Sequence, residues 1–412
     1  MHKQKLYLYL SILISLAISP TCEAQVLGLE LLDDKESITI PFEYKQGFLS
    51  LDIRMANLPL NFLFDTGAEH TILFKKEISD ILGFKYEEPL KIAGADLHRI
   101  ITAYITRGIP LQLDNTISVD RDIIVLEEDF LYFDQITGES IDGILGARFF
   151  RGLIVEIDYK KKIIVLYKSL PKKVLKSKYV KLNSSFLKHK PYVNCTIENN
   201  GDTISAEILI DTGAAVPFLL FLSEESKMSL PENYIVGNLG RGLGGDIVGY
   251  MGKTDNYSLH KQFVFNDLIT SYQLYEPDTL NNIVVARDGL IGNPLLERFN
   301  IVIDYVREEV YVKPNKRFNK PIEYDISGLV LYAFGNDLSG YFVKEVLPGS
   351  PAEQAGIQTG DIIKKMGFFS TNFYTLEQIY KRLVKRKGKK VNMVIERKGE
   401  KLKKTLILTD NL

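Results

Sequence analysis

The chain has 412 residues, of which 45% are apolar and 25% are charged, and its formal net charge is −1. This composition is typical of a globular protein and excludes a disordered or wholly membrane-embedded chain. A net charge this close to zero excludes a global field that would attract nucleic acid or an anionic membrane, so no nucleic-acid partner is expected. The length allows two or three domains.

Residues 1–24 have the layout of a secretory signal peptide. Lys3 and Lys5 precede an apolar run at 6–18, which is short for a membrane-spanning helix. The small residues of "CEA" at 22–24 suit a cleavage site. We therefore expect an exported protein, either periplasmic or secreted.

The mature chain is expected to begin near Gln25. A lipid anchor on Cys22 is not expected, because "SPTC" lacks the leucine and small residue that usually precede a lipidated cysteine. Removal of the signal peptide leaves Cys195 as the remaining cysteine, so no intramolecular disulfide is possible. The sequence leaves open whether residues 25–40 form a short pro-segment.

The first half of the chain has the pattern of a β-structure around "FLFDTGAEHTILF" at 62–74. Apolar or alternating runs at 48–53 and 60–64 have the length and composition of strands, with turn residues at 57–59 between them. Further along, the motif "DGILG" occupies 142–146. Beyond it we expect a short helix and two strands, at 147–152, 153–159 and 163–168.

A shift of 146 residues brings four landmarks of the first half onto similar ones in the second. The four pairs are Asp65 and Asp211, "DGILG" (142–146) and "DGLIG" (288–292), "VEIDY" (155–159) and "IVIDY" (301–305), and Gly94 and Gly240. Four matches in one register indicate an internal duplication. We predict two β lobes, at 25–175 and 176–318, bounded by the basic, proline-containing segments 170–178 and 313–321.

Each repeated aspartate ends an apolar strand and is followed by Thr and Gly. A buried carboxylate needs hydrogen bonds, and a hydroxyl and the backbone N–H of a turning glycine can provide them. Pseudo-twofold packing of the copies would bring the carboxyls of Asp65 and Asp211 face to face. Two such groups share one proton, and together they can activate a water for attack on a carbonyl. One aspartate alone would be a weak signal.

These residues resemble the active-site motifs of the aspartic peptidases over about 36–313. "ILG" (144–146) and "LIG" (290–292) are similar to the family's second landmark, the strand beside the active-site loop. Ala after each "DTG", the short copies and a glycine-bearing hairpin candidate in both halves resemble the retropepsin-like members rather than the pepsins. The resemblance implies two duplicated aspartic-peptidase β lobes that form one pseudo-twofold catalytic unit.

The resemblance also implies a role for individual residues. Asp65 and Asp211 would be catalytic, and Thr66 and Thr212 would interlock beneath them. The full set of implied site residues is Asp65 and Asp211 for catalysis, Thr66, Gly67, Thr212 and Gly213 for support, and Gly94, Gly240, Gly242, Gly244 and Gly245 for the flaps over the substrate. The halves differ after the motif, as "DTGAEH" and "DTGAAV". This difference implies an asymmetric cleft and leaves loss of activity open.

Three further patterns are not interpreted as sites. "GRGLGG" at 240–245 fits a nucleotide-binding pattern formally, but Gly249 and Gly252 oppose the helix that this site needs. The five histidines show no metal-ligand spacing, and we expect neither a metal nor a cofactor. The basic residues at 381–404 overlie an intact apolar periodicity, which favours a solvated surface over a binding face.

The C-terminal residues 322–412 have a different, α+β pattern. "SPAE" predicts a capped short helix, and 375–388 predicts a second helix that begins with a capping box. The segment resembles a bacterial PDZ domain over about 326–410. The resemblance implies that Ser339, Gly340, Tyr341 and Phe342 bind the carboxylate end of a peptide. A PDZ domain that only packs against the lobes and binds no ligand remains an alternative.

The sequence thus predicts an exported, single-chain aspartic endopeptidase, mostly β, with a C-terminal PDZ domain that recruits or gates the substrate. The expected partners are a polypeptide substrate and a peptide C-terminus, and the expected state is a monomer. Two alternatives stay open. The chain could be an inactive protein that binds peptides through its cleft and PDZ domain, or a peptidase that completes its site by dimerising. The duplication argues against the second, since each chain supplies both aspartates.

Overall fold

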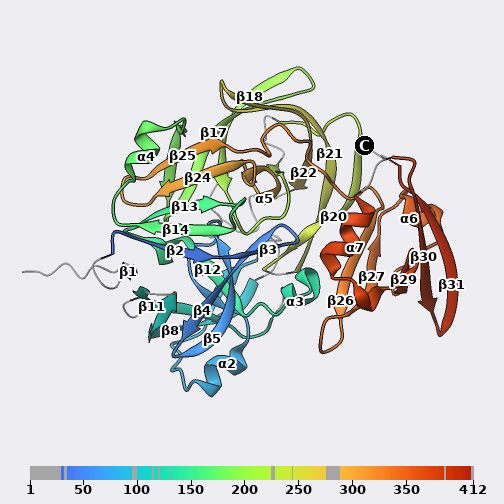
Figure 1. The fold of residues 1–412 in the computed structure, drawn as a ribbon, viewed down its shortest axis with the longest axis horizontal. Helices are drawn as coiled ribbons and strands as arrows, with labels where there is room; N and C mark the ends of the chain where they lie inside the picture. Colours follow the sequence, from blue (N-terminus) through green and yellow to red (C-terminus); the bar gives the residue numbers. More distant parts are fainter. Residues whose placement is uncertain are drawn as a thin grey trace, which may run out of the picture.

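We describe a computed structural model of the chain, which is mostly β (Figure 1). The structure describes residues 29–31, 35–94, 100–113, 116–118, 121–129, 131–223, 228–243, 245–274, 288–384 and 387–409. The expected signal peptide at 1–24, including Cys22, lies outside these residues, as does Gly244. Within the described ranges, no helix is both long and apolar enough to cross a lipid bilayer.

The first half forms one sheet with the order β1-β10-β9-β4-β5-β12-β6-β11-β8-β7, and β3 pairs with β4. The predicted strands at 48–53 and 60–64 are confirmed within β4 and β5. The strands are β1 (Leu29–Leu31), β3 (Glu43–Lys45), β4 (Phe48–Met55), β5 (Leu58–Asp65), β6 (Ile72–Leu73), β7 (Leu90–Ala93), β8 (Ile100–Ile109), β9 (Leu111–Leu113), β10 (Thr116–Ser118), β11 (Arg121–Leu126) and β12 (Gly143–Gly146). The helices of this half are α2 (Lys76–Ile81), α3 (Phe133–Thr137) and the 3-10 helix η1 (Ala147–Phe150).

The second half forms a sheet with the order β16-β17-β18-β23-β19-β22-β21-β20. Its strands are β16 (Ser184–Leu187), β17 (Lys190–Asn199), β18 (Asp202–Ile210), β19 (Phe218–Leu222), β20 (Tyr234–Gly242), β21 (Gly245–His260), β22 (Phe263–Leu274) and β23 (Gly289–Ile291), followed by helix α5 (Asn293–Leu296). Cys195 is buried in β17, as expected of a small strand hydrophobe.

Corresponding strands of the two halves pair in the same register. Gly143 of β12 lies opposite Phe62 of β5, and Gly289 of β23 lies opposite Ile208 of β18. Likewise, β11 pairs parallel with β6, and β22 pairs parallel with β19. Gly289 follows Gly143 by 146 positions, and Ile208 follows Phe62 by the same number, which is the spacing between the two "DTGA" motifs.

A third sheet joins the halves, in the order β15-β25-β24-β13-β14-β2. At its centre β13 pairs antiparallel with β24, so that Glu156 lies opposite Val302, the residue 146 positions later. One hydrophobic core continues through both halves and includes Phe64, Ile208 and Ile303. The elements are β2 (Ser37–Pro41), β13 (Ile154–Asp158), β14 (Ile163–Tyr167), α4 (Lys172–Lys176), β15 (Val180–Lys181), β24 (Phe299–Asp304) and β25 (Glu309–Pro314).

The C-terminal domain has its own sheet, in the order β26-β27-β28-β30-β31, and its own core, which includes Leu331, Val343 and Ile395. It stands beside the second half of the chain (Figure 1, orange to red). Its elements are β26 (Leu329–Phe334), β27 (Gly340–Val346), α6 (Pro351–Gln354), β28 (Ile362–Met366), β29 (Phe369–Ser370), η3 (Thr371–Phe373), α7 (Leu376–Leu383), β30 (Lys390–Arg397) and β31 (Glu400–Ile407).

Both predicted helix starts in this domain are confirmed. Ser350 caps α6 by accepting from the Glu353 N–H, and Thr375 forms a capping box with Gln378 at the start of α7. The predicted end of the second helix is wrong, because α7 ends at Leu383. Leu383 is the last buried residue of α7, and Val384, its C-cap, is only partly buried.

An ion pair stabilises the C-terminal domain and gives a first prediction. The buried carboxylate of Asp361 accepts two bonds from the Arg397 guanidinium, at 2.6 and 2.7 Å. We expect Asp361→Ala to lower the free energy of unfolding by about 2–4 kcal/mol, because it leaves the guanidinium without its partner. Glu377→Ala, which removes an exposed pair with Lys381, should cost less than about 0.5 kcal/mol. Urea denaturation of both variants measures this, and equal losses would contradict it.

Candidate active site

Asp65 and Asp211 lie together where the two halves meet. Asp65 is the last residue of β5 and lies opposite Gly146 of β12. Asp211 directly follows β18, and its N–H donates to the carbonyl of Ile291 in β23. Each aspartate thus leaves a buried strand at a point where a neighbouring parallel strand holds its backbone. Asp65 is half-buried and Asp211 is buried.

The two carboxyl groups are held by their own turns and contact each other. Oδ1 of Asp65 accepts from the N–H groups of Gly67 and Ala68, at 2.7 and 3.0 Å. In the same way, Oδ1 of Asp211 accepts from the Gly213 N–H at 2.8 Å. Each carboxyl is therefore held by the backbone of its own turn. The two carboxyls also lie close together, since each lies against the glycine of the other motif and the charge of Asp211 adds to burial in raising the pKa of Asp65.

The environment holds a proton on this pair. Burial, followed by the charge of Asp211, raises the pKa of Asp65 to about 8, against the opposing effect of the backbone N–H groups. Two neighbouring carboxyls titrate as one unit, and the second proton is hard to remove because two like charges would then face each other. At neutral pH the pair therefore carries one proton and one negative charge.

The threonines beneath the carboxyls bond reciprocally across the halves. The Thr66 N–H donates to Oγ1 of Thr212, and the Thr212 N–H donates to Oγ1 of Thr66, both at 3.0 Å. The hydroxyl of Thr66 then donates to the Ile210 carbonyl at 2.6 Å, and that of Thr212 to the Phe64 carbonyl at 2.8 Å. Both side chains are buried. The structure thus brings together all six residues of the two "DTG" motifs.

Removal of one hydroxyl from this network gives a second prediction. Thr66→Val should lower the free energy of unfolding by about 2–4 kcal/mol, because it leaves the buried Thr212 N–H and Ile210 carbonyl without partners. Thr66→Ser keeps the hydroxyl and should cost less than half as much. Chemical denaturation of the two variants compares them. A valine variant as stable as the serine variant would show that these bonds do not hold the halves together.

The hairpin β20–β21 extends from the second half to the first. Leu243, at its tip, packs against a first-half cluster that includes Phe48 and Phe133. The Arg241 guanidinium lies over the ring of Tyr132, 4.7 Å from its centroid, and pairs with Asp246 at 2.7 Å. The hairpin therefore contacts both halves rather than the half that carries it alone.

The predicted flap glycines fall on hairpin segments. Gly240 and Gly242 end β20, and Gly245 begins β21, with φ values of 141° for Gly240 and 127° for Gly245 that side chains rarely adopt. Gly244 lies outside the described residues. In the first half, Gly94 directly follows β7 and is buried, and residues 95–99 lie outside the described residues.

The two sides of the site differ beyond the "DTGA" motifs. In the first half, Oε1 of Glu69 lies 3.4 Å from Nε2 of His70, and its Oε2 lies 3.9 Å from Nζ of Lys188. This side of the site is therefore charged. Ala215 is the equivalent of Glu69 and packs closely against Gly47, so the other side is small and apolar. The expected asymmetry is thus present in the residues that follow each aspartate.

Sequence reasoning missed Asn293, which links the halves under the site. Its Nδ2 donates to the carbonyls of Thr212 and Gly47, at 2.7 and 2.6 Å, and its Oδ1 accepts from the Tyr159 hydroxyl at 2.7 Å. The equivalent residue in the first half is Ala147. The exchange of Ala for Asn was visible in the repeat, but nothing in the sequence showed which carbonyls the amide would reach.

The residues expected to bind a peptide in the C-terminal domain, 339–342, do not lie at a free edge of its sheet. Near Phe342, β27 is paired with β26 on one side and β28 on the other, so an extended peptide cannot pair with it there. Ser339 directly precedes this inner strand, and Gly340 and Tyr341 are its first two residues. Among the described residues, β26 is instead at the edge of the sheet, and α7 lies beside it.

Much of this β26 edge is already occupied. The Leu331 N–H donates to the Tyr380 hydroxyl at 2.9 Å, and that hydroxyl donates back to the Leu331 carbonyl at 3.3 Å. Helix α3 of the first half packs beside β26 (Figure 1). Burial raises the pKa of the Tyr332 hydroxyl, and the nearby Arg241 of the hairpin opposes this shift. Sequence reasoning did not find these contacts, which join elements far apart along the chain.

Comparison with known proteins identifies the C-terminal part. The family model of the PDZ domain matches residues 328–396, in agreement with the resemblance seen in the sequence. No curated protein matches the chain. The domain formed by β26 to β31 is therefore a PDZ domain, a module that binds peptides or proteins.

Proposed function

We propose that the chain is an aspartic-type endopeptidase, with Asp65 and Asp211 as the catalytic pair and the two halves as its duplicated, retropepsin-like lobes. The observation that carries this proposal is the reciprocity of the site. Each motif supplies one carboxyl, one threonine hydroxyl bonded to the other half, and one glycine packed against the other half's carboxyl. A structural aspartate would need no counterpart of this kind.

The shared proton suggests how the pair would work. In the resting state Asp65 would carry the proton, and Asp211 would be the base. A water between them would lose a proton to Asp211 as its oxygen bonds to the peptide carbon, while Asp65 protonates the carbonyl oxygen. The pair keeps one proton, now on Asp211. Collapse of the diol then breaks the C–N bond, as the amine takes a proton from Asp211 and a diol hydroxyl returns one to Asp65.

The PDZ domain would recruit the polypeptide substrate or gate its entry. Its contacts support this role, because it packs against α3 of the first half and, through Tyr332, against Arg241 of the hairpin. Export remains part of the proposal and rests on the sequence pattern at 1–24. The monomer is favoured because one chain supplies both carboxyls and both threonines.

The second candidate function is an inactive peptide-binding protein. It is favoured by the PDZ domain itself and by the hairpin, whose tip residue Leu243 already rests against the first half. In this case the pair of carboxyls would be a structural remnant, and the protein would hold peptides without hydrolysing them.

The test is to incubate the chain with a diverse peptide mixture from about pH 3 to 10 and to identify new termini by mass spectrometry. The peptidase predicts discrete cleavage sites and a rate that falls as pH rises through about 8, where the shared proton leaves. A folded chain that retains peptides but cleaves none at any pH would support the second function instead.

A further inference from the structure

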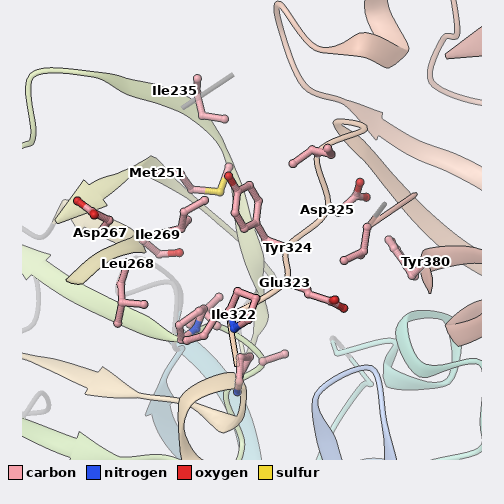
Figure 2. A pocket seen from close by; sticks show the side chains of 18 of the residues that line it. Ile235, Met251, Asp267, Leu268, Ile269, Ile322, Glu323, Tyr324, Asp325 and Tyr380 are labelled. Atoms are coloured by element: carbon pink, nitrogen blue, oxygen red, sulfur yellow. The ribbon is translucent and has the colours of Figure 1, made fainter. Parts of the chain in front are cut away.

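A cavity of about 900 Å³ lies between the second half and the PDZ domain (Figure 2). One wall is formed by the hairpin β20–β21 and by β22, and the opposite wall by β26 and α7. The connecting segment 318–326 runs along it. The walls are held together where Gly237 of β20 meets Leu347, since a Cβ on Gly237 would lie 2.6 Å from Cδ2 of Leu347.

The cavity begins beside the candidate active site. Ala215 and Val216, which line it, are the fourth and fifth residues after Asp211. Val216 packs with Met251 in one hydrophobic cluster, and Met251 lines the cavity as well. A chain leaving the catalytic pair on the Asp211 side would therefore meet the mouth of the cavity within a few residues.

The lining is mainly apolar and comes from three separate parts of the chain. Ile235, Met251 and Ile269 project from the hairpin and β22, as Figure 2 shows. Ile322 belongs to the connecting segment, and Leu347 to the PDZ domain. Since no single domain supplies this surface, it exists only while the PDZ domain is docked on the second half.

The charges around the cavity are predominantly negative. Asp267, Glu323 and Asp325 line it, and Lys320 is the exposed cation among them. Arg298 also lines it and keeps its positive charge while its guanidinium donates to the carbonyls of residues 317, 320 and 321, so the three acidic side chains exceed the basic ones by one. Three carboxylates disfavour a ligand that brings a carboxylate of its own, and they favour an uncharged or basic one.

The cavity also offers backbone partners. Strands β20 and β26 are the end strands of their sheets in the described part of the chain, and both reach the cavity, at Ile235 and at Gly328 to Val330. On β26 the N–H groups of Leu329 and Leu331 already donate to the hydroxyls of Ser327 and Tyr380, so the strand edge that the cavity offers to a peptide is that of β20. An extended peptide can use such an edge for main-chain hydrogen bonds.

We propose that this cavity is an exosite for an extended, apolar segment of the polypeptide substrate, uncharged or basic at its ends, that flanks the scissile bond on the Asp211 side. The inference rests on the proposed peptidase function and adds the class of segment selected. It assigns an internal stretch of the substrate, rather than a free carboxylate terminus, to the surface that the PDZ domain shares with the second half.

The test compares peptides with the same scissile sequence, taken from a site cleaved in the mixture. One is short, one is extended by alternating Leu and Thr with a terminal Lys amide, and one carries the same extension ending in a free Asp. The amidated extension should lower KM about tenfold or more with little change in kcat. Equal KM values for short and extended peptides, or a preference for the free carboxylate, would overturn the inference.

Two variants at neighbouring residues of β20 test whether the lower KM of the extended peptide arises in the cavity. Ile235→Asp places a charge in the cavity, whereas Val236→Asp changes the next residue of β20, which is 51% exposed and does not line it. The first should abolish the gain from the extension and leave cleavage of the short peptide unchanged, and the second should change neither. Leu347→Asp approaches the cavity from the PDZ side and replaces Ile235→Asp if that variant does not fold. An extension effect that survives both cavity variants would overturn the inference.

A binding measurement separates this inference from the peptidase function. Anisotropy of the fluorescein-labelled extension alone, alternating Leu and Thr with a terminal Lys amide, is measured with the full chain carrying Asp65→Asn and Asp211→Asn. Binding lost in Ile235→Asp supports the exosite even if the wild type cleaves nothing, in which case only the peptidase function fails. Cleavage without binding of the labelled extension would retain the peptidase and reject the exosite.

Discussion

Asp65→Asn and Asp211→Asn are each expected to lower the rate of peptide cleavage by about 10²–10⁴-fold. An amide at either position can neither take a proton from water nor pass the shared proton to the carbonyl oxygen. Its Oδ1 can still accept from the N–H groups of the "DTGA" turn, so the fold should survive. The loss should therefore appear in kcat, with little change in peptide binding.

Asp65→Asn should also change how the free energy of unfolding depends on pH. Asp65 has an ordinary pKa near 3.8 and a folded-state pKa of about 8, so the folded state keeps a proton that the unfolded state releases between these values. The wild type therefore loses stability as pH rises from about 4 to 8. Asp65→Asn lacks this penalty and should be more stable than the wild type by about 1–3 kcal/mol at pH 8, and close to it at pH 4.

The exposed Asp52 provides the control. Asp52→Asn should leave both the cleavage rate and the pH dependence of unfolding as in the wild type. If Asp65→Asn retained full activity, or if its stability curve followed that of the wild type, the two carboxyls would not form the reacting pair.

Gly67→Ala and Gly213→Ala are expected to reduce cleavage by at least about 100-fold, because each side chain would displace the opposite carboxyl. A Cβ on Gly67 would lie 2.5 Å from Cγ of Asp211, and one on Gly213 would lie closer still to Cγ of Asp65. No carbon can approach that closely, so the carboxyls must separate. Precise placement of reacting groups accounts for factors of this size when it is lost by about 1 Å.

Gly108→Ala separates this effect from the general cost of replacing glycine. Gly108 has a φ of 69° with open space around it, so alanine there should cost about 1 kcal/mol of stability and no activity. Steady-state kinetics of the three variants, with thermal unfolding as a check of folding, make the comparison. A Gly213→Ala variant as active as Gly108→Ala would show that the carboxyls need not be in contact.

Local patterns in the sequence predicted much of the arrangement around the aspartates. An apolar strand that ends at an aspartate and is followed by small residues permits few conformations. The second "DTGA" copy repeats this pattern, so it supports the strand and turn predicted for the first copy. The register of β12 with β5 and of β23 with β18 agrees with the 146-residue spacing for this reason. The helix N-caps of the PDZ domain, Ser350 at α6 and the capping box of Thr375 and Gln378 at α7, were equally local and equally predictable.

What the sequence did not predict depends on contacts between distant segments. Asn293 is a polar residue after a glycine, and only its approach to Thr212 gives it a role. The strand edge near Phe342 was misplaced because the pairing of β27 on both sides depends on the whole sheet. Likewise, the cavity between the PDZ domain and the second half arises from docking, which no single motif encodes.

The most direct test of the account is a titration of the two carboxyls by carbon-13 NMR, with labelled aspartate and with Asp65→Asn and Asp211→Asn for assignment. A reacting pair should keep one proton until the pH approaches 8, and loss of either carboxyl should change the titration of the other. Two carboxyls that both ionise below about pH 5, each indifferent to the removal of its neighbour, would contradict it.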